Sequence, residues 1–161
     1  MPLLYSVGDK IVHPMHGAGV IENIVSQKVE GALFHYYVMK MPVTAMLVMI
    51  PTHTANEIGV RAIVDSDTAE ELIGSLPDLE ISTIPNWNRR YRENMLKIKS
   101  GDPMEVARVV KGLSMRDRQR GLSTGERKLL HSARQIMISE IVLAQSCSYA
   151  DVENRINIAL A

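Results

Sequence analysis

The sequence predicts an α+β protein with two domains, a small N-terminal β-barrel followed by an all-α helical bundle. The first 66 residues hold short β-branched and aromatic runs between Pro and Gly turns, a pattern typical of strands. From residue 86 onwards apolar residues recur at steps of three and four, a pattern typical of helices. The charge also changes: residues 1–76 carry four basic and eight acidic side chains, whereas residues 86–161 carry fourteen and eight. Two parts of opposite charge indicate different partners, and the basic part is a candidate for nucleic acid.

The N-terminal runs predict five strands, the last of them very short. A turn rich in Pro and Gly separates the first two strands, and Pro51 ends the fourth. Short antiparallel strands within about 60 residues fit a small barrel better than a sandwich, which normally needs about seven strands. The predicted strands are residues 10–13, 20–29, 33–40, 44–50 and 58–60.

One hairpin of this barrel has features of a protein-binding surface. Methionine suits an apolar surface that adapts to a partner, and the hairpin carries Met39, Met41, Met46 and Met49. Alternation along the strands sends about half of these side chains into the core. A small open barrel also leaves an edge strand, whose backbone groups can pair with another chain.

A short helix and a linker are expected between the two domains. Residues 68–71 read Thr-Ala-Glu-Glu, a capping box that predicts a helix continuing to about Leu76. Pro77 stops this helix, and residues 77–85 have a proline at each end and no periodicity. We therefore expect a barrel domain at 1–66, a short helix and linker at 67–85, and a helical domain at 86–161.

Capping residues predict four helices in the helical domain. Each predicted N-cap is followed by an apolar stripe, and Gly101 and Gly121 end the first two helices. The third helix is the longest and continues to about Gln145. Short connections between four helices predict a compact bundle. The predicted N-cap residues are Asn86, Asp102, Ser123 and Ser148.

Several classes of protein are not supported by the sequence. No phosphate-binding Gly-rich loop or nucleophile motif is present, and His13 and His16 lack a third metal ligand nearby in the sequence. The single cysteine, Cys147, cannot form an internal disulfide. No apolar run approaches the roughly 18 residues of a membrane span. We expect a cytoplasmic monomer that is not an enzyme and has no cofactor, metal, membrane anchor or small-molecule substrate.

The only tryptophan, Trp87, stands at the start of a strongly basic region. Residues 86–134 contain thirteen basic and five acidic side chains, and Arg89, Arg90 and Arg92 lie within five residues after Trp87. Such a concentration, together with the free amide groups of a helix start, suits phosphate oxygens. Trp87 itself has two interpretations. It packs the first helix onto the bundle, or it projects as an apolar wedge into a DNA minor groove, and periodicity does not separate the two.

Several short motifs together resemble one family, although none is specific alone. They occur in the same order as in the family and cover essentially the whole chain. The chain resembles the CarD family (CarD/CdnL) of bacterial transcription regulators. The motifs are Val7-Gly8-Asp9 with His16-Gly17, Asn86-Trp87-Asn88-Arg89-Arg90-Tyr91, Ser100-Gly101-Asp102, Arg120-Gly121-Leu122-Ser123 and Gly125-Glu126-Arg127.

The resemblance implies a role for the helical domain at promoter DNA. Members of the family insert a tryptophan into the minor groove at the upstream edge of the −10 element, where it stabilises the open complex. Trp87 matches that tryptophan. Basic side chains near it would hold the DNA backbone with little base specificity. The candidate DNA-binding residues are Trp87, Arg89, Arg90, Arg92, Arg116, Arg127 and Lys128.

The resemblance also implies that the N-terminal domain is a Tudor-like, SH3-like barrel that binds the β subunit of RNA polymerase. Some relatives carry arginines where this chain has Gln27 and Met49, so the chemistry of that contact differs here. The alternative is a module that binds proteins through both domains without touching DNA. The candidate polymerase-binding residues are Gln27, Met46, Val48, Met49 and Ile50.

Overall fold

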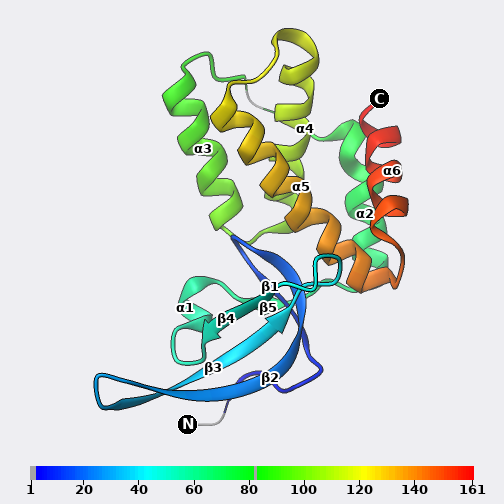
Figure 1. Cartoon of the computed structure of the whole chain (residues 1–161). Coiled ribbons are helices and arrows are strands. Elements are labelled where there is room, and N and C mark those ends of the chain that lie inside the picture. Colours follow the sequence, from blue (N-terminus) through cyan, green and yellow to red (C-terminus); the bar gives the residue numbers. More distant parts are fainter. Residues whose placement is uncertain (1–2, 82) are drawn as a thin grey trace.

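A computed structural model describes residues 3–81 and 83–161 of the chain, which form an antiparallel sheet followed by a group of helices (Figure 1). This arrangement confirms the predicted two-domain α+β fold. The strands are β1 (Lys10–His13), β2 (Gly17–Val29), β3 (Ala32–Lys40), β4 (Leu47–Pro51) and β5 (Arg61–Ala62). The helices are α1 (Ala55–Ile58), α2 (Ser66–Ser75), the 3-10 helix η1 (Leu76–Asp78), α3 (Trp87–Lys99), α4 (Pro103–Arg120), α5 (Thr124–Gln145) and α6 (Tyr149–Leu160).

The sheet has the strand order β4-β3-β2-β1-β5 and is open, with β4 and β5 at its edges. The long strand β2 pairs with β1 through its first residues and with β3 through the rest. Met39 and Met41 are buried while Met46 and Met49 are exposed, as strand alternation predicts. The core of the sheet is formed by Ile11, Ile21, Tyr37, Met39, Met41, Ile50, Ala55 and Val60.

Three of the predicted strands are wrong in position. β2 begins at Gly17 rather than at residue 20, because it pairs with β1 from Gly17 onwards. β4 begins at Leu47 rather than at residue 44, because residues 42–44 form a turn and Ala45 adopts a positive φ of 55°. The strand predicted at 58–60 is absent from the described residues. Gly59 has a φ of 101° and terminates α1, which the sequence did not predict, and the fifth strand follows it as β5.

The four predicted caps of the helical domain are confirmed, because each side chain accepts a backbone N–H of its own first turn. The capping box at Thr68 is wrong. The N-cap of α2 is Asp65, whose Oδ1 accepts the Thr68 N–H at 2.7 Å, so the helix starts three residues earlier than predicted. Apolar residues of α2 and η1 lie in the same core as the later helices, including Ala69, Leu72, Ile73 and Leu76.

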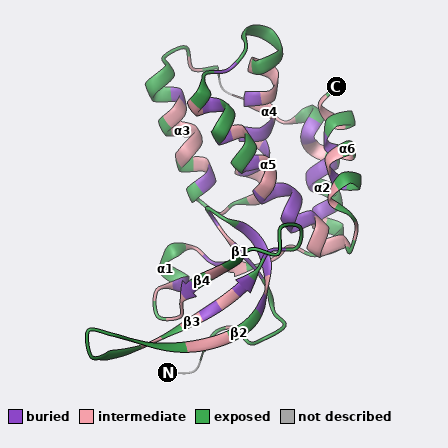
Figure 2. Cartoon of the chain, in the orientation of Figure 1, coloured by how far each residue is buried: buried purple, intermediate pink, exposed green. Residues whose placement is uncertain are grey.

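The helix α5 is the central element of the helical domain. It contacts α2, α4 and α6, and it also contacts β2 of the sheet. Its 22 residues correspond to a length of about 33 Å. In Figure 2 the buried residues of the helices face one another, whereas the far end of the β2–β3 hairpin is exposed. One helix therefore reaches from the sheet to the opposite end of the molecule (Figure 1).

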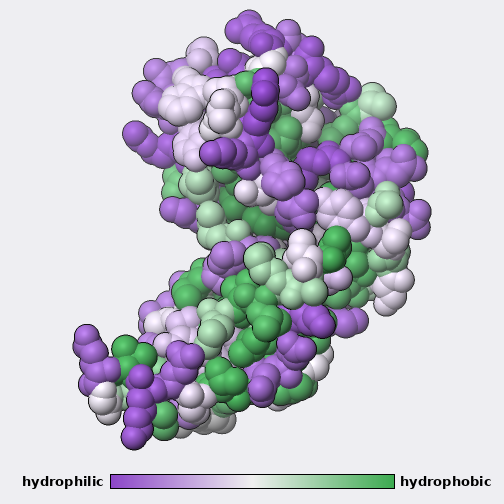
Figure 3. All heavy atoms as spheres, viewed as in Figure 1, coloured by the Kyte–Doolittle hydropathy of each residue, from purple (hydrophilic) through white to green (hydrophobic). Residues whose placement is uncertain are grey.

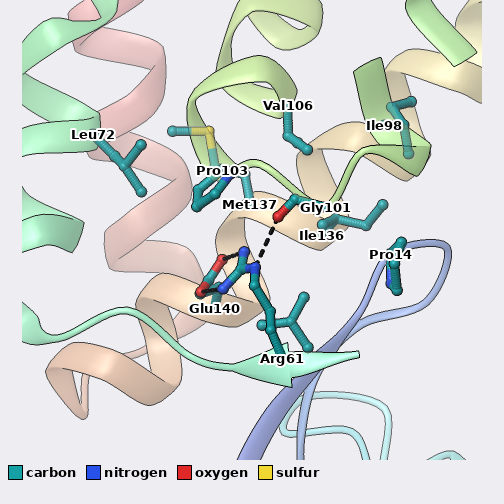
Figure 4. Close-up of a pocket in the computed structure, with 11 residues that line it drawn as sticks. Pro14, Arg61, Leu72, Ile98, Gly101, Pro103, Val106, Ile136, Met137 and Glu140 are labelled. Carbon is teal, nitrogen blue, oxygen red and sulfur yellow. Dashed lines mark hydrogen bonds and ion pairs between the residues drawn. The ribbon is translucent and has the colours of Figure 1, made fainter. Parts of the chain in front are cut away.

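A partly buried ion pair joins the sheet to the helices (Figure 4). Arg61 of β5 donates to both carboxylate oxygens of Glu140 of α5, at 2.7 and 2.9 Å. The Arg61 Nε also donates to the Gly101 carbonyl at 2.8 Å, and the Val64 N–H donates to Glu140 at 2.9 Å. The same carboxylate thus fixes the end of β5 and the chain that leaves it.

A second contact lies where β2 begins. The Ala18 N–H donates to the Ser139 Oγ at 2.9 Å. A Cβ on Gly17 would approach the same oxygen to 2.7 Å, and Gly17 also has a positive φ of 96°. Only glycine fits this close approach of strand and helix without strain.

Candidate nucleic-acid interface

Trp87 is held in one orientation and is still largely open to solvent. It begins α3, its indole Nε1 donates to the Ser123 Oγ at 2.9 Å, and 44% of the residue is exposed. The indole stacks on Tyr91 with ring centroids 5.5 Å apart and planes inclined by 20°. A Cβ on Gly125 of α5 would make only ordinary contacts with the two rings, 3.7 Å from Trp87 and 3.8 Å from Tyr91, so α5 lies directly beside them. Trp87 therefore packs α3 against α5 and also presents an apolar surface outward.

The starts of α3 and α5 lie at the same end of the helical domain (Figure 1), where Figure 3 shows a gathering of hydrophilic side chains. The free N–H groups of a first helical turn carry partial positive charge. Cations at this position do not favour the helix itself, so the basic side chains here are better explained by an anionic partner. The exposed basic residues in the early turns of the two helices are Arg89, Arg92, Arg127 and Lys128.

Arg90 differs from its neighbours because its guanidinium group points into the protein. Only 8% of Arg90 is exposed, although the sequence placed it among the DNA-facing residues. Its Nε and Nη2 donate to the two carboxylate oxygens of Glu126 at 2.8 and 3.0 Å. Its Nη1 donates to the carbonyls of Ile84 and Pro85 at 2.9 and 3.2 Å. Arg90 therefore holds the start of α3 to the start of α5.

Each member of the Arg90–Glu126 pair stabilises the charged form of the other. The hydrogen bonds from Arg90 lower the pKa of Glu126 against the opposing effect of burial, and the charge of Arg116 lowers it further. The same bonds raise the pKa of Arg90. Both groups are therefore charged at neutral pH. In the sequence Glu126 stands out only as part of the motif Gly125-Glu126-Arg127, and the structure shows that its carboxylate accepts both bonds of the interhelical pair.

Arg116 lies apart from the exposed arginines. It is partly buried on α4, and it lines a pocket bounded by α3, α4 and the segment that precedes α3. Its Nε is buried and has no hydrogen-bond partner among the described residues. Arg116 thus borders this pocket, and its charge acts on Glu126.

The second group of candidates lies on the edge strand β4, on the residue just before it and on β2, which β3 separates from β4. Met46, Met49 and Gln27 are exposed, Val48 is half-buried and Ile50 is only 1% exposed. The Ile50 side chain belongs to the core of the sheet and is closed to a partner, which differs from the expectation.

The backbone of β4 is open on one side. At the two ends of the β3–β4 ladder the Met41 N–H donates to the Met46 carbonyl and the Thr52 N–H donates to the His35 carbonyl. Hydrogen-bonded pairs recur at every second residue of an antiparallel ladder, so the N–H and C=O groups of Ile50 and Val48 face β3. The backbone groups of the alternate residues Leu47 and Met49 then face the free edge. This edge can accept a further strand.

Two family models together cover nearly the whole chain. Residues 64–157 match the model described as "CarD, C-terminal domain", and residues 5–64 match "CarD-like/TRCF RID domain". The chain belongs to the CarD family. A relative from Bacillus subtilis (strain 168), named "Putative transcription factor YdeB", is 31% identical over 151 residues, which are 94% of this chain and 99% of the relative. CarD family membership makes the chain a transcription-related regulator that interacts with RNA polymerase, a type of protein distinct from the known enzyme classes.

Two kinds of feature are absent from the described residues. No three His, Cys, Asp or Glu side chains within residues 3–81 and 83–161 lie close enough together to hold a metal ion. In the same residues, no helix combines the length and the apolar character needed to cross a membrane.

Proposed function

We propose that this CarD family chain binds the β subunit of RNA polymerase and stabilises the promoter open complex by inserting Trp87 into the minor groove at the upstream edge of the −10 element. The observation that carries the proposal is the position of Trp87. It is a fixed and exposed aromatic side chain at the start of α3, beside the start of α5, and the first turns of both helices are basic. Apolar side chains that enter a minor groove act by separating base steps, while nearby cations hold the backbone.

The fixed orientation of the indole favours a wedge. Stacking on Tyr91 and the bond to Ser123 hold the ring before DNA is met, so little side-chain entropy is lost on binding. The indole N–H, its only donor, is already bound to Ser123. The exposed part of the ring is therefore apolar, and it recognises the ease with which a base step opens rather than a base edge.

Phosphate contacts would come from Arg89, Arg92, Arg127 and Lys128, which are exposed. Each phosphate contact of this kind adds affinity that weakens as the salt concentration rises. For duplex DNA, each contact makes the slope of log K against log salt concentration more negative by roughly 0.9. Arg90 acts as a positioning residue, because it holds the start of α3 that carries Trp87.

The polymerase contact is assigned to the edge of β4. Met46 and Met49 would provide adaptable apolar contacts, Gln27 a polar one, and the free backbone of the strand would pair with a strand of the β subunit. Such a tether raises the effective concentration of the helical domain at the promoter, on the order of millimolar for a short connection. Weak DNA contacts then suffice.

The variant Trp87→Ala tests the wedge. It should keep its fold and its affinity for polymerase, and the lifetime of the open complex should fall by about tenfold, the scale of one lost stacking contact. Lifetimes are measured by competitor challenge on a linear promoter. The matched control is Leu96→Ala, which removes another exposed apolar side chain from α3 and should leave the lifetime unchanged.

Photocrosslinking separates the proposal from the DNA-independent alternative. A photoreactive residue in place of Trp87 should crosslink to promoter DNA at the upstream edge of the bubble only when polymerase is present. Loss of polymerase binding in Trp87→Ala, together with the absence of any DNA crosslink, would favour a module that binds only proteins.

A further inference from the structure

A pocket of about 270 Å³ lies behind the start of α3, between α3, α4 and the residues Ile81, Thr83 and Ile84 that precede α3. Its volume is close to the lower end of the range of small-ligand sites, about 300–1,000 Å³. No acidic side chain is among the described residues that line it. The charged side chains in its lining are Arg90, Lys97, Arg108 and Arg116.

These cations are only partly neutralised by the protein. Arg108 is paired with Glu105 at 2.8 Å, and Arg90 is paired with Glu126. Arg116 lies in the field of the same Glu126, but its buried Nε has no hydrogen-bond partner among the described residues. A buried donor without a partner is unfavourable unless a ligand or water satisfies it.

The wall of the pocket also contains a glycine in the middle of α4. A glycine inside a helix lowers helix stability relative to alanine, so it usually has a local reason. A Cβ on Gly112 would meet only Ile81, at 3.8 Å, which is an ordinary contact. Packing therefore does not require glycine at this position, and its effect is to leave the pocket open.

We propose that this pocket binds a small phosphorylated molecule. Its phosphate group is held by the charges of Arg116 and Lys97, which line the pocket and form no salt bridge with the described residues. Its organic part lies against the apolar side chains of Ile84 and Leu113, and Asn94 and Gln119 offer amide groups to it. The assignment rests on the pocket alone and does not depend on DNA binding by Trp87.

Occupancy of the pocket has a consequence for α3. Arg90 lines the pocket and also bonds the carbonyls of Ile84 and Pro85 and the carboxylate of Glu126. A bound anion therefore acts on the residue that holds the start of α3. On the proposed function, the ligand would regulate how firmly Trp87 is presented.

Titration calorimetry of the full chain tests the site, with inorganic pyrophosphate and AMP as probes at constant ionic strength. We expect saturable binding of one ligand per chain. Arg116→Gln should weaken it about tenfold, the effect of one charge-assisted hydrogen bond. The matched control Arg118→Gln, an exposed arginine on the same helix that does not line this pocket, should bind as the wild type does.

A second variant keeps every charge and fills the space. Gly112→Leu should abolish binding. Circular dichroism shows whether each variant is folded, so the result for one variant remains decisive if the other unfolds. Absence of saturable binding for both probes at millimolar concentration would overturn the proposal. Equal weakening by Arg116→Gln and Arg118→Gln would overturn it too, because that pattern indicates nonspecific charge.

A DNA arm distinguishes this site from the wedge. Trp87→Ala should bind pyrophosphate like the wild type, so failure of the wedge leaves the pocket result intact. If neither probe binds while Arg116→Gln weakens binding to a promoter duplex, the pocket serves a DNA phosphate, and the assignment to a small ligand is overturned.

Discussion

The two ends of α5 use the same chemistry for different purposes. Near each end a buried glutamate accepts two hydrogen bonds from one arginine: Glu126 from Arg90 of α3, and Glu140 from Arg61 of β5. Each arginine also bonds a backbone carbonyl next to one end of α3, so that helix is tied to α5 at both of its ends. These carbonyls belong to Ile84 and Pro85 before α3 and to Gly101 after it.

The pairs differ in exposure and in what they join. The Arg90 side chain is 10% exposed and the Arg61 side chain 29%. The Arg90–Glu126 pair lies within the helical domain and fixes the helix start that carries Trp87. The Arg61–Glu140 pair crosses from the sheet to the helices and fixes how the domains are oriented. Breaking them one at a time should therefore separate local presentation of the indole from the arrangement of the domains.

The largest expected effect on stability is that of Glu126→Ala. It leaves the buried guanidinium of Arg90 without its partner, a change that typically costs about 3–5 kcal/mol. Urea unfolding measures the loss. Glu105→Ala is the control, because its pair with Arg108 is one-third exposed and should contribute roughly 0–1 kcal/mol. Equal losses in the two variants would show that burial of the Arg90 pair does not matter.

Glu140→Ala should lower the free energy of unfolding less than Glu126→Ala does, and it should alter the relative orientation of the two domains more. Arg61 can turn partly to water, so we expect a loss of about 1–3 kcal/mol, mainly from the Val64 N–H and the Arg61 donors left unpaired. Small-angle scattering should report a broader distribution of domain orientations, which Glu126→Ala should not produce. An unchanged scattering profile would assign the domain orientation to other contacts, such as the Ala18–Ser139 bond.

The pH dependence of stability should distinguish the Arg90–Glu126 pair directly. Because the pKa of Glu126 lies below its usual 4.5 in the folded protein, the pair stabilises the fold above that value. The stabilisation should be lost as the pH falls from about 4.5 through the folded pKa. The difference in unfolding free energy between the wild type and Glu126→Gln should thus shrink on acidification. A difference that grows at low pH would contradict the charged pair.

The smallest effect is expected for Ser123→Ala. This change removes the cap of α5 and the acceptor of the indole N–H, at a cost of about 1 kcal/mol. The freed indole should be quenched more readily by acrylamide, and Trp87 is the only tryptophan to report it. Ser148→Ala removes the equivalent cap of α6 and should leave the quenching unchanged.

The sequence predicted the parts of the fold that depend on neighbouring residues. The caps at Asn86, Asp102 and Ser123 act on N–H groups two or three residues away, so a local pattern is sufficient. The cap of α2 was misplaced because Asp65 and Thr68 are both capping residue types, and only the structure shows that Asp65 accepts the bond. β5 was misplaced because its partner β1 lies about fifty residues earlier in the chain.

The sequence predicted which residue types make up the candidate site but not how their side chains are arranged. Trp87 and the exposed arginines follow from the sequence, since their types and crowding are visible there. The inward position of Arg90 does not, because its partner Glu126 is 36 residues away, and Glu140 is 79 residues from Arg61. No periodic pattern pairs charges at such separations. One arginine in a run of three was therefore assigned to the surface with its neighbours.

The length of α5 has a consequence for promoter geometry. Its rise of about 1.5 Å per residue makes its 22 residues a rigid spacer of about 33 Å between the sheet and Trp87. Duplex DNA advances about 3.4 Å per base pair, so on the proposed function this helix acts as a ruler of roughly ten base pairs. The distance from the polymerase then determines which base step the indole reaches, and the ease with which that step opens determines how well the indole enters it.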